Sequence, residues 1–337
     1  MRRVAMLALV ASVSGCRLVA GIEDIQLTGS NDGGTEGGAL PKPEVLTSAA
    51  GEPVKGLLVD GNFVFARTDT SIWRCPVGGC PAPEVIVPSA TPVIHDFAIV
   101  GGELYYATSE GNGTIRAVAF DGKNGRVYRT VAEVYDLATD GTQLFWSISP
   151  QSTTGGSVQR CATPTCAAPA TVMTVDFGSA TATELHVFSG NIHAVALAMS
   201  GVEEPMFKCA LAGSCGANPQ TFITDATGMT FSPSTTRLFF ASDTAYGYYD
   251  PAGKKTILGN GETSQSGNWV AGDDAFVFAN VYQSASAADE YIVRAPVGGG
   301  APTPVAAAKT FGAGAVSGGY VYFSYVATAV VLARLKE

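Results

Sequence analysis

The sequence predicts an all-β fold, a seven-bladed β-propeller, and three observations lead to this prediction. A motif made of an apolar strand, a glycine-containing turn and a second strand rich in aromatic residues recurs along the chain. Its copies lie about 40 to 50 residues apart, a spacing typical of folds built from repeated sheets. The 337 residues include 40 Gly and 18 Pro and are only 15% charged, which suits short strands joined by tight turns. The two ends of the repeated region also fit together.

Seven copies of the motif define the inner pair of strands in each repeat. The copies span 57–65, 97–106, 137–146, 185–195, 231–240, 270–278 and 315–323.

Each complete repeat has room for four strands. In the second repeat the four strands are predicted at 97–100, 103–107, 114–120 and 126–132. Four-stranded sheets repeated around an axis form a β-propeller, so seven repeats predict seven blades.

The ends of the repeated region predict how the ring closes. Residues 330–334 read as the third strand of a repeat that has no fourth strand after it. Residues 43–46 resemble 83–86, the fourth strand of the first repeat. We therefore expect the N-terminal strand to complete the last blade and remove an open sheet edge.

The N-terminus carries the features of an export signal. Arg2 and Arg3 precede an apolar run over 4–13, which is too short to cross a bilayer core of about 30 Å. Residues 13–16, Val-Ser-Gly-Cys, resemble the lipobox of bacterial lipoproteins. The resemblance implies cleavage before Cys16 and acylation of that cysteine. Ordinary secretion with an incidental cysteine is the alternative.

These features predict three regions. Residues 1–15 form the signal peptide, 16–41 comprise the lipidated Cys16 and a flexible tether rich in Gly, Ser and Asp, and 42–337 form the propeller. A lipid-anchored protein of the bacterial cell envelope is expected, on the outer membrane rather than the inner one.

The other cysteines fall into three local pairs, each bracketing a turn. In an exported protein this spacing favours disulfides that close hairpins. Zinc is the alternative, but zinc sites usually have shorter cysteine gaps and need four ligands. The expected disulfides join Cys75 to Cys80, Cys161 to Cys166 and Cys209 to Cys215.

The charge balance excludes one class of partner. The chain has 20 basic and 29 acidic residues, a net charge of −9, and no basic cluster. Nucleic acid is not expected as a partner, because phosphate binding depends on clustered cations.

Aromatic tetrads end several inner hairpins and carry a family resemblance. The repeat resembles YWTD/low-density-lipoprotein-receptor-like or NHL-like propellers, and with the lipobox the chain resembles bacterial propeller lipoproteins. No tetrad is Tyr-Trp-Thr-Asp itself, so the receptor family's ligands are not implied. The tetrads are 105–108, 145–148, 239–242 and 322–325.

Aligning the repeats on their glycine turns places one residue per blade at the channel mouth, just before the inner strand. Oxygen-bearing side chains from five consecutive blades are candidates for a site that binds Ca²⁺ or a cationic group. The alternative is that they cap strand ends by accepting backbone N–H groups. The candidates are Asp96, Asp136, Glu184, Thr230 and Asn268, with Gly56 and Ala313 at the two remaining positions.

The three histidines offer weaker candidates for chemistry. His186 and His193 flank a two-residue turn and are expected to face each other as a cross-strand pair rather than a metal site. His95 beside Asp96 is a formal acid–base couple, although an exposed loop histidine is the simpler interpretation. No hydrolase elbow, phosphate loop or His-Glu-x-x-His motif occurs.

Together these observations favour a monomeric interaction module over an enzyme. The expected partners are an envelope protein, a peptide or a glycan, with no cofactor required. The alternative is a calcium-dependent hydrolase or lactonase that uses the acidic channel mouth, and a purely structural lipoprotein is a third possibility. Trp73, Trp146 and Trp269 are expected to pack between blades, with sugar stacking as the alternative.

Overall fold

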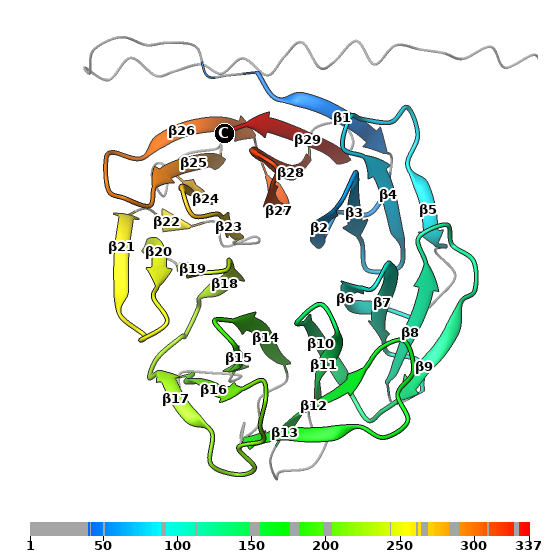
Figure 1. The fold of residues 1–337 in the computed structure, drawn as a ribbon. Helices are drawn as coiled ribbons and strands as arrows, with labels where there is room; N and C mark the ends of the chain where they lie inside the picture. Colours follow the sequence, from blue (N-terminus) through cyan, green and yellow to red (C-terminus); the bar gives the residue numbers. More distant parts are fainter. Residues whose placement is uncertain are drawn as a thin grey trace, which may run out of the picture.

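The computed structural model describes residues 40, 42–49, 51–88, 92–111, 113–148, 156–175, 182–197, 204–242, 244–260, 262–263, 269–282, 290–308, 310–326 and 330–337. Residues 1–39, which include the predicted signal peptide and Cys16, lie outside the described residues. The described chain forms seven β-sheets arranged around a central axis (Figure 1), so the predicted seven-bladed propeller is confirmed. Among these residues, no helix is long and apolar enough to cross a membrane.

Each blade is an antiparallel sheet, and in blades 1 to 6 its strands run in chain order from the axis to the rim (Figure 1). Blade 1 contains β2 (Gly56–Asp60), β3 (Phe63–Arg67), β4 (Ile72–Pro76) and β5 (Glu84–Val87). Blade 2 contains β6 (Ile94–Val100), β7 (Glu103–Thr108), β8 (Thr114–Ala119) and β9 (Arg126–Thr130). Blade 3 contains β10 (Val134–Thr139), β11 (Gln143–Ile148), β12 (Gly156–Ala162) and β13 (Ala170–Val175). Blade 4 contains β14 (Ala182–Phe188), β15 (Asn191–Leu197), β16 (Met206–Ala210) and β17 (Gln220–Ile223).

Blade 5 follows the same plan, whereas blade 6 has two short inner strands and blade 7 takes its outermost strand from the start of the repeated region. Blade 5 contains β18 (Thr230–Pro233), β19 (Leu238–Ala241), β20 (Ala245–Tyr249) and β21 (Lys255–Asn260). Blade 6 contains β22 (Glu262–Thr263) and β23 (Val270–Gly272), which both pair with β24 (Phe276–Tyr282), followed by β25 (Glu290–Pro296) and β26 (Thr303–Ala308). Blade 7 contains β27 (Phe311–Ser317), β28 (Tyr320–Val326), β29 (Val330–Lys336) and β1 (Glu44–Ala49).

The N-terminal strand closes the ring as predicted. β1 pairs antiparallel with β29, from Glu44 opposite Arg334 to Ala49 opposite Val330. The first and last strands of the chain therefore lie side by side at the rim of blade 7 (Figure 1). This pairing satisfies backbone groups that would otherwise form an open edge.

The hydrophobic core is divided among the contacts between blades. Seven clusters of buried side chains each combine residues of two adjacent blades. Trp146 packs with residues of blades 2 and 3, Trp73 with residues of blades 7 and 1, and Trp269 with residues of blades 6 and 7. All three tryptophans are buried, which agrees with the predicted packing role.

The three predicted disulfides are confirmed. Their Cα–Cα distances are 5.7 Å for Cys75–Cys80, 5.4 Å for Cys161–Cys166 and 5.9 Å for Cys209–Cys215. Each bond closes the turn between the third and fourth strands of its blade, in blades 1, 3 and 4. Stable disulfides of this kind are typical of exported proteins rather than cytoplasmic ones.

Candidate functional site at the channel mouth

A cavity of about 620 Å³ runs along the propeller axis, with a wall formed by the inner strands of all seven blades. Six of the seven positions that the repeat alignment selected line this cavity. They are Gly56, Asp96, Asp136, Glu184, Thr230 and Ala313. The seventh, Asn268, lies outside the described residues, and Trp269 and Val270 line the cavity from blade 6.

The acidic positions lie inside their strands, and the alignment had placed them just before. β6 begins at Ile94 and β10 at Val134, so Asp96 and Asp136 are both strand residues. A β-bulge lies near the start of both strands, between Ile94 and Asp96 in β6 and between Val134 and Leu137 in β10. A bulge lets a strand continue while it redirects side chains and interrupts the ladder. Glu184 lies inside β14, which pairs with β15 without a register shift.

Two of the carboxylates bind the backbone of the next blade. The amide of Leu137 in blade 3 donates to Oδ2 of Asp96 in blade 2 over 2.9 Å. The amide of Leu185 in blade 4 donates to Oδ2 of Asp136 in blade 3. The two side chains therefore accept backbone N–H groups, as the alternative to ligand binding proposed, but inside strands rather than at strand ends, and each of them joins two blades.

Asp136 lies in an environment that favours its neutral form. Burial raises the pKa of the Asp136 carboxyl well above its ordinary value of 3.8, and the charge of Asp96 and a hydrogen bond with Asp96 raise it further. The charge of Glu184 acts in the same direction, and the hydrogen bond from the Leu185 amide opposes the increase. Asp136 keeps partial exposure, and it lines the central cavity. A proton on Asp136 can be shared with Asp96 while both side chains accept a backbone amide.

Glu184 and Thr230 complete the polar part of the wall. Glu184 lies 3.4 Å from Nε2 of His186, whose ring is 5.9 Å from that of Phe231. In the described structure, the buried hydroxyl of Thr230 has no hydrogen-bond partner. Within the described ranges, no three His, Cys, Asp or Glu side chains lie close enough together to hold a metal ion. Calcium binding at the channel mouth stays a prediction.

The predicted histidine pair is confirmed in register. His186 lies directly opposite His193, and the turn between their strands uses positive φ angles of 49° at Ser189 and 72° at Gly190. His193 is only 1% exposed and its ring is 4.7 Å from that of Phe222. Burial lowers the pKa of His193 to about 3, and the charges of His186 and Lys208 act in the same direction.

His95 occupies the bulge of β6 beside Asp96. Its ring lies 5.3 Å from that of Tyr135 in blade 3. Burial, followed by the charge of Arg67, lowers the pKa of His95. Oδ2 of Asp96, the predicted partner of His95 in an acid–base couple, accepts the Leu137 amide and so takes part in the contact between blades 2 and 3.

The sequence reasoning missed two buried glutamates, Glu204 and Glu290. Glu290 at the start of β25 is fully buried, and its Oε2 accepts the amide of Phe311 in blade 7 over 3.0 Å. This is the same contact that Asp96 and Asp136 make, but it comes from a third strand instead of an inner strand. The sequence signal that could have indicated this role is the position of Glu290 directly before the apolar strand residues 291–293.

No protein-family model matches this chain, and no curated protein matches it in sequence. Among solved structures, the chain is similar to the β-propeller domain of the Trilobed protease from Pyrococcus furiosus, which is described as having an open velcro topology. That likeness has a TM-score of 0.55 at 10% identity and covers 85% of this chain and 94% of the other. The computationally designed Ika8 protein gives a TM-score of 0.54 at 11% identity, covering 87% and 100%. At such low identity these likenesses show the propeller fold alone.

Proposed function

We propose that the protein is a lipid-anchored binding module of the bacterial cell envelope, whose propeller takes part of a peptide, protein or glycan partner into the mouth of its channel. The observation that carries the proposal is the cavity of about 620 Å³ bounded by all seven inner strands. A partly polar concave site of this size is typical of ligand binding.

The lipid anchor rests on the sequence of residues 13–16 and on the three disulfides, which indicate an exported protein. Radiolabelled palmitate supplied to a bacterial host should label the full chain and should not label a Cys16→Ser variant. Labelling of both proteins, or of neither, would contradict lipidation of Cys16.

The wall of the cavity favours a partner with both a polar or cationic part and an apolar part. Blades 2, 3 and 4 contribute Asp96, Asp136 and Glu184, and the partly exposed side chains of Ile99 and Val187 add apolar surface to the same wall. Carboxylates suit hydroxyl and ammonium donors, and the aliphatic side chains suit apolar groups.

Peptide and glycan arrays probed with the full chain in detergent would test this proposal. Glu184→Gln removes a charge from the wall and should weaken retained ligands by about tenfold. Glu84→Gln is the matched control, because Glu84 pairs with Arg74 at the rim, where its side chain is 53% exposed. Equal loss of ligand binding in both variants, or no binding on both the peptide and the glycan array, would refute a binding role for the channel.

A calcium-dependent hydrolase is the second candidate. The observation that favours it is that Asp96, Asp136 and Glu184 line one cavity wall, although the described residues do not bring three such side chains close enough to hold a metal ion by themselves. Calorimetric titration of the chelator-treated full chain with Ca²⁺ distinguishes the two. Stoichiometric binding that is lost in Asp96→Ala would support the hydrolase. The absence of binding would leave Asp96 with its observed role toward Leu137.

A further inference from the structure

The turn closed by Cys75–Cys80 rests directly on the ring-closing strand. β1 has a bulge between Val45 and Thr47, so Leu46 has no ladder partner in β29. The carbonyl of Leu46 instead accepts the amide of Cys80 over 2.9 Å. The disulfide turn thus provides the hydrogen bond that the ladder does not.

Gly79 makes this close approach possible. Its φ is +96°, and a Cβ at this position would lie 3.3 Å from the Leu46 carbonyl oxygen. The side chain of Leu46 is 4% exposed and packs in the core between blades 7 and 1. Both the backbone and the side chain of Leu46 are therefore held by blade 1.

Arg334 of β29 also contacts β1 and the disulfide turn. Its guanidinium lies 4.6 Å from the centre of the Tyr320 ring, and its Nε donates to Glu44 of β1 over 2.9 Å. Its Nη1 donates to the carbonyl of Val77, inside the disulfide turn, over 2.5 Å. One side chain of β29 therefore contacts both β1 and the turn of blade 1.

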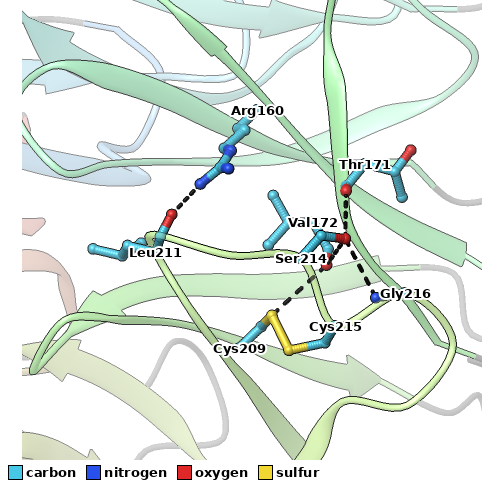
Figure 2. The surroundings of a disulfide bond; sticks show 8 residues. All are labelled: Arg160, Thr171, Val172, Cys209, Leu211, Ser214, Cys215 and Gly216. Atoms are coloured by element: carbon cyan, nitrogen blue, oxygen red, sulfur yellow. Dashed lines mark hydrogen bonds between the residues drawn. A yellow bond between two sulfur atoms is a disulfide. The ribbon is translucent and has the colours of Figure 1, made fainter.

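An equivalent arrangement joins blades 3 and 4, where the ring is not closed by a distant strand. Figure 2 shows the Cys209–Cys215 turn of blade 4 beside β13, with Arg160 donating to the carbonyl of Leu211. The amide of Cys215 donates to the carbonyl of Val172 over 2.8 Å. Val172 also lies at a bulge, since the register of β13 shifts between Thr171 and Met173. The contact is thus a repeated element of the fold.

The contact of the Cys75–Cys80 turn with β1 and the contact of the Cys209–Cys215 turn with β13 differ in how the contacted strand is connected to its blade. β13 belongs to a blade whose four strands follow one another in the chain, so it stays with blade 3 if the turn loosens. β1 lies far in sequence from the other strands of blade 7, and it is held there by noncovalent contacts to β29 and to the disulfide turn. Opening the Cys75–Cys80 turn therefore acts on the closure of the whole ring.

We propose that the Cys75–Cys80 turn is a redox-sensitive latch on the ring closure, so that its reduction releases β1 from blade 7. The reductant is a dithiol, whose thiolate attacks the sulfur of the partly exposed Cys80 and expels the buried Cys75 sulfur as a thiolate, which then takes up a proton. The second thiol of the reductant displaces Cys80 from the mixed disulfide. The dithiol ends as a disulfide, and both cysteines end as thiols.

The test is amide hydrogen exchange, read by mass spectrometry, on the full chain and two double variants. Cys75→Ala/Cys80→Ala removes the latch, and Cys209→Ala/Cys215→Ala is the matched control. In the latch variant, β1 and β29 should exchange about tenfold faster or more, whereas the control should accelerate exchange in β13 and leave β1 unchanged. Trypsin should also cleave sooner after the exposed Lys55, which lies between β1 and β2.

Unchanged exchange of β1 in the latch variant, or equal acceleration in both variants, would overturn the proposal. If the latch variant does not fold, the folded wild-type chain can be treated with dithiothreitol and alkylated to identify which disulfide has opened. Molecules with Cys75 and Cys80 alkylated must then show fast exchange in β1. Slow exchange in those molecules would equally overturn the proposal.

Discussion

Replacing Asp136 by asparagine should make the propeller increasingly more stable than the wild type as the pH rises. In the folded protein, burial and the Asp96 carboxylate raise the pKa of Asp136 well above 3.8. The introduced side-chain amide reproduces the protonated carboxyl, because its oxygen can accept the Leu185 amide while its NH₂ group donates to Asp96. The variant keeps both contacts without the need for a proton.

The sign follows from proton binding. Above the unfolded-state pKa of about 4, the unfolded chain has lost the Asp136 proton while the folded protein still holds it. The free energy of unfolding of the wild type therefore falls as the pH rises through this window, up to the raised folded-state pKa. The slope for one proton is about 1.4 kcal/mol per pH unit. The Asp136→Asn variant lacks this slope, so its advantage should grow by about that amount with each pH unit until the pH reaches the raised folded-state pKa of Asp136, and it should stay constant above that pKa.

Guanidinium unfolding of both proteins between about pH 4 and pH 8 would measure this difference. Asp140→Asn is a useful control from the same blade. Burial raises the pKa of Asp140, but hydrogen bonds from Thr142 and Gln143 outweigh this and lower it overall. Because the folded-state pKa of Asp140 lies below its unfolded value of about 4, loss of Asp140 should cost the same stability throughout pH 4 to 8, without the slope expected for Asp136. If Asp136→Asn destabilises the protein equally at every pH, the shared-proton interpretation is wrong.

Three further changes test the packing of the core within and between blades. Gly314→Val should cost about 1–3 kcal/mol in thermal unfolding, because an added Cβ would lie 2.3 Å from the ring of Trp269; a neutral result would mean that this ring moves freely. His193→Phe should reduce the loss of stability that accompanies acidification below the unfolded-state histidine pKa of about 6.5. The reason is that the buried wild-type histidine stays neutral down to about pH 3, whereas the unfolded chain takes up a proton. In an acid titration followed by tryptophan fluorescence, an unchanged midpoint would show that His193 does not contribute. Glu290→Ala should lower the free energy of unfolding by about 1–3 kcal/mol, because the buried Phe311 amide loses its acceptor. Denaturant titrations should show that Glu290→Gln recovers most of this loss. Failure of Glu290→Gln to do so would mean that the negative charge itself is needed.

The contacts between neighbouring strands were predictable because their signals are local. The turn of Ser189 and Gly190 sets His186 opposite His193, and a sequence separation of 5 between Cys75 and Cys80 suffices for a disulfide. The repeat spacing indicated the blades, and the match between 43–46 and 83–86 predicted that β1 would pair with β29. Each of these inferences compares short segments of the chain, so residue type and spacing were enough.

The roles of the channel residues were decided by the tertiary structure. Asp96 accepts an amide 41 residues away in the next blade, and this contact depends on a bulge in β6. A shift of one residue in a strand moves a side chain to the opposite face, so a bulge that the sequence does not mark changes what each side chain reaches. The sequence by itself determined the seven blades, their closure and the disulfides. Only the packing of blades distant in sequence decided that carboxylates would join neighbouring blades and that a disulfide turn would hold the closing strand, because these contacts form between segments whose relative positions exist only in the folded ring.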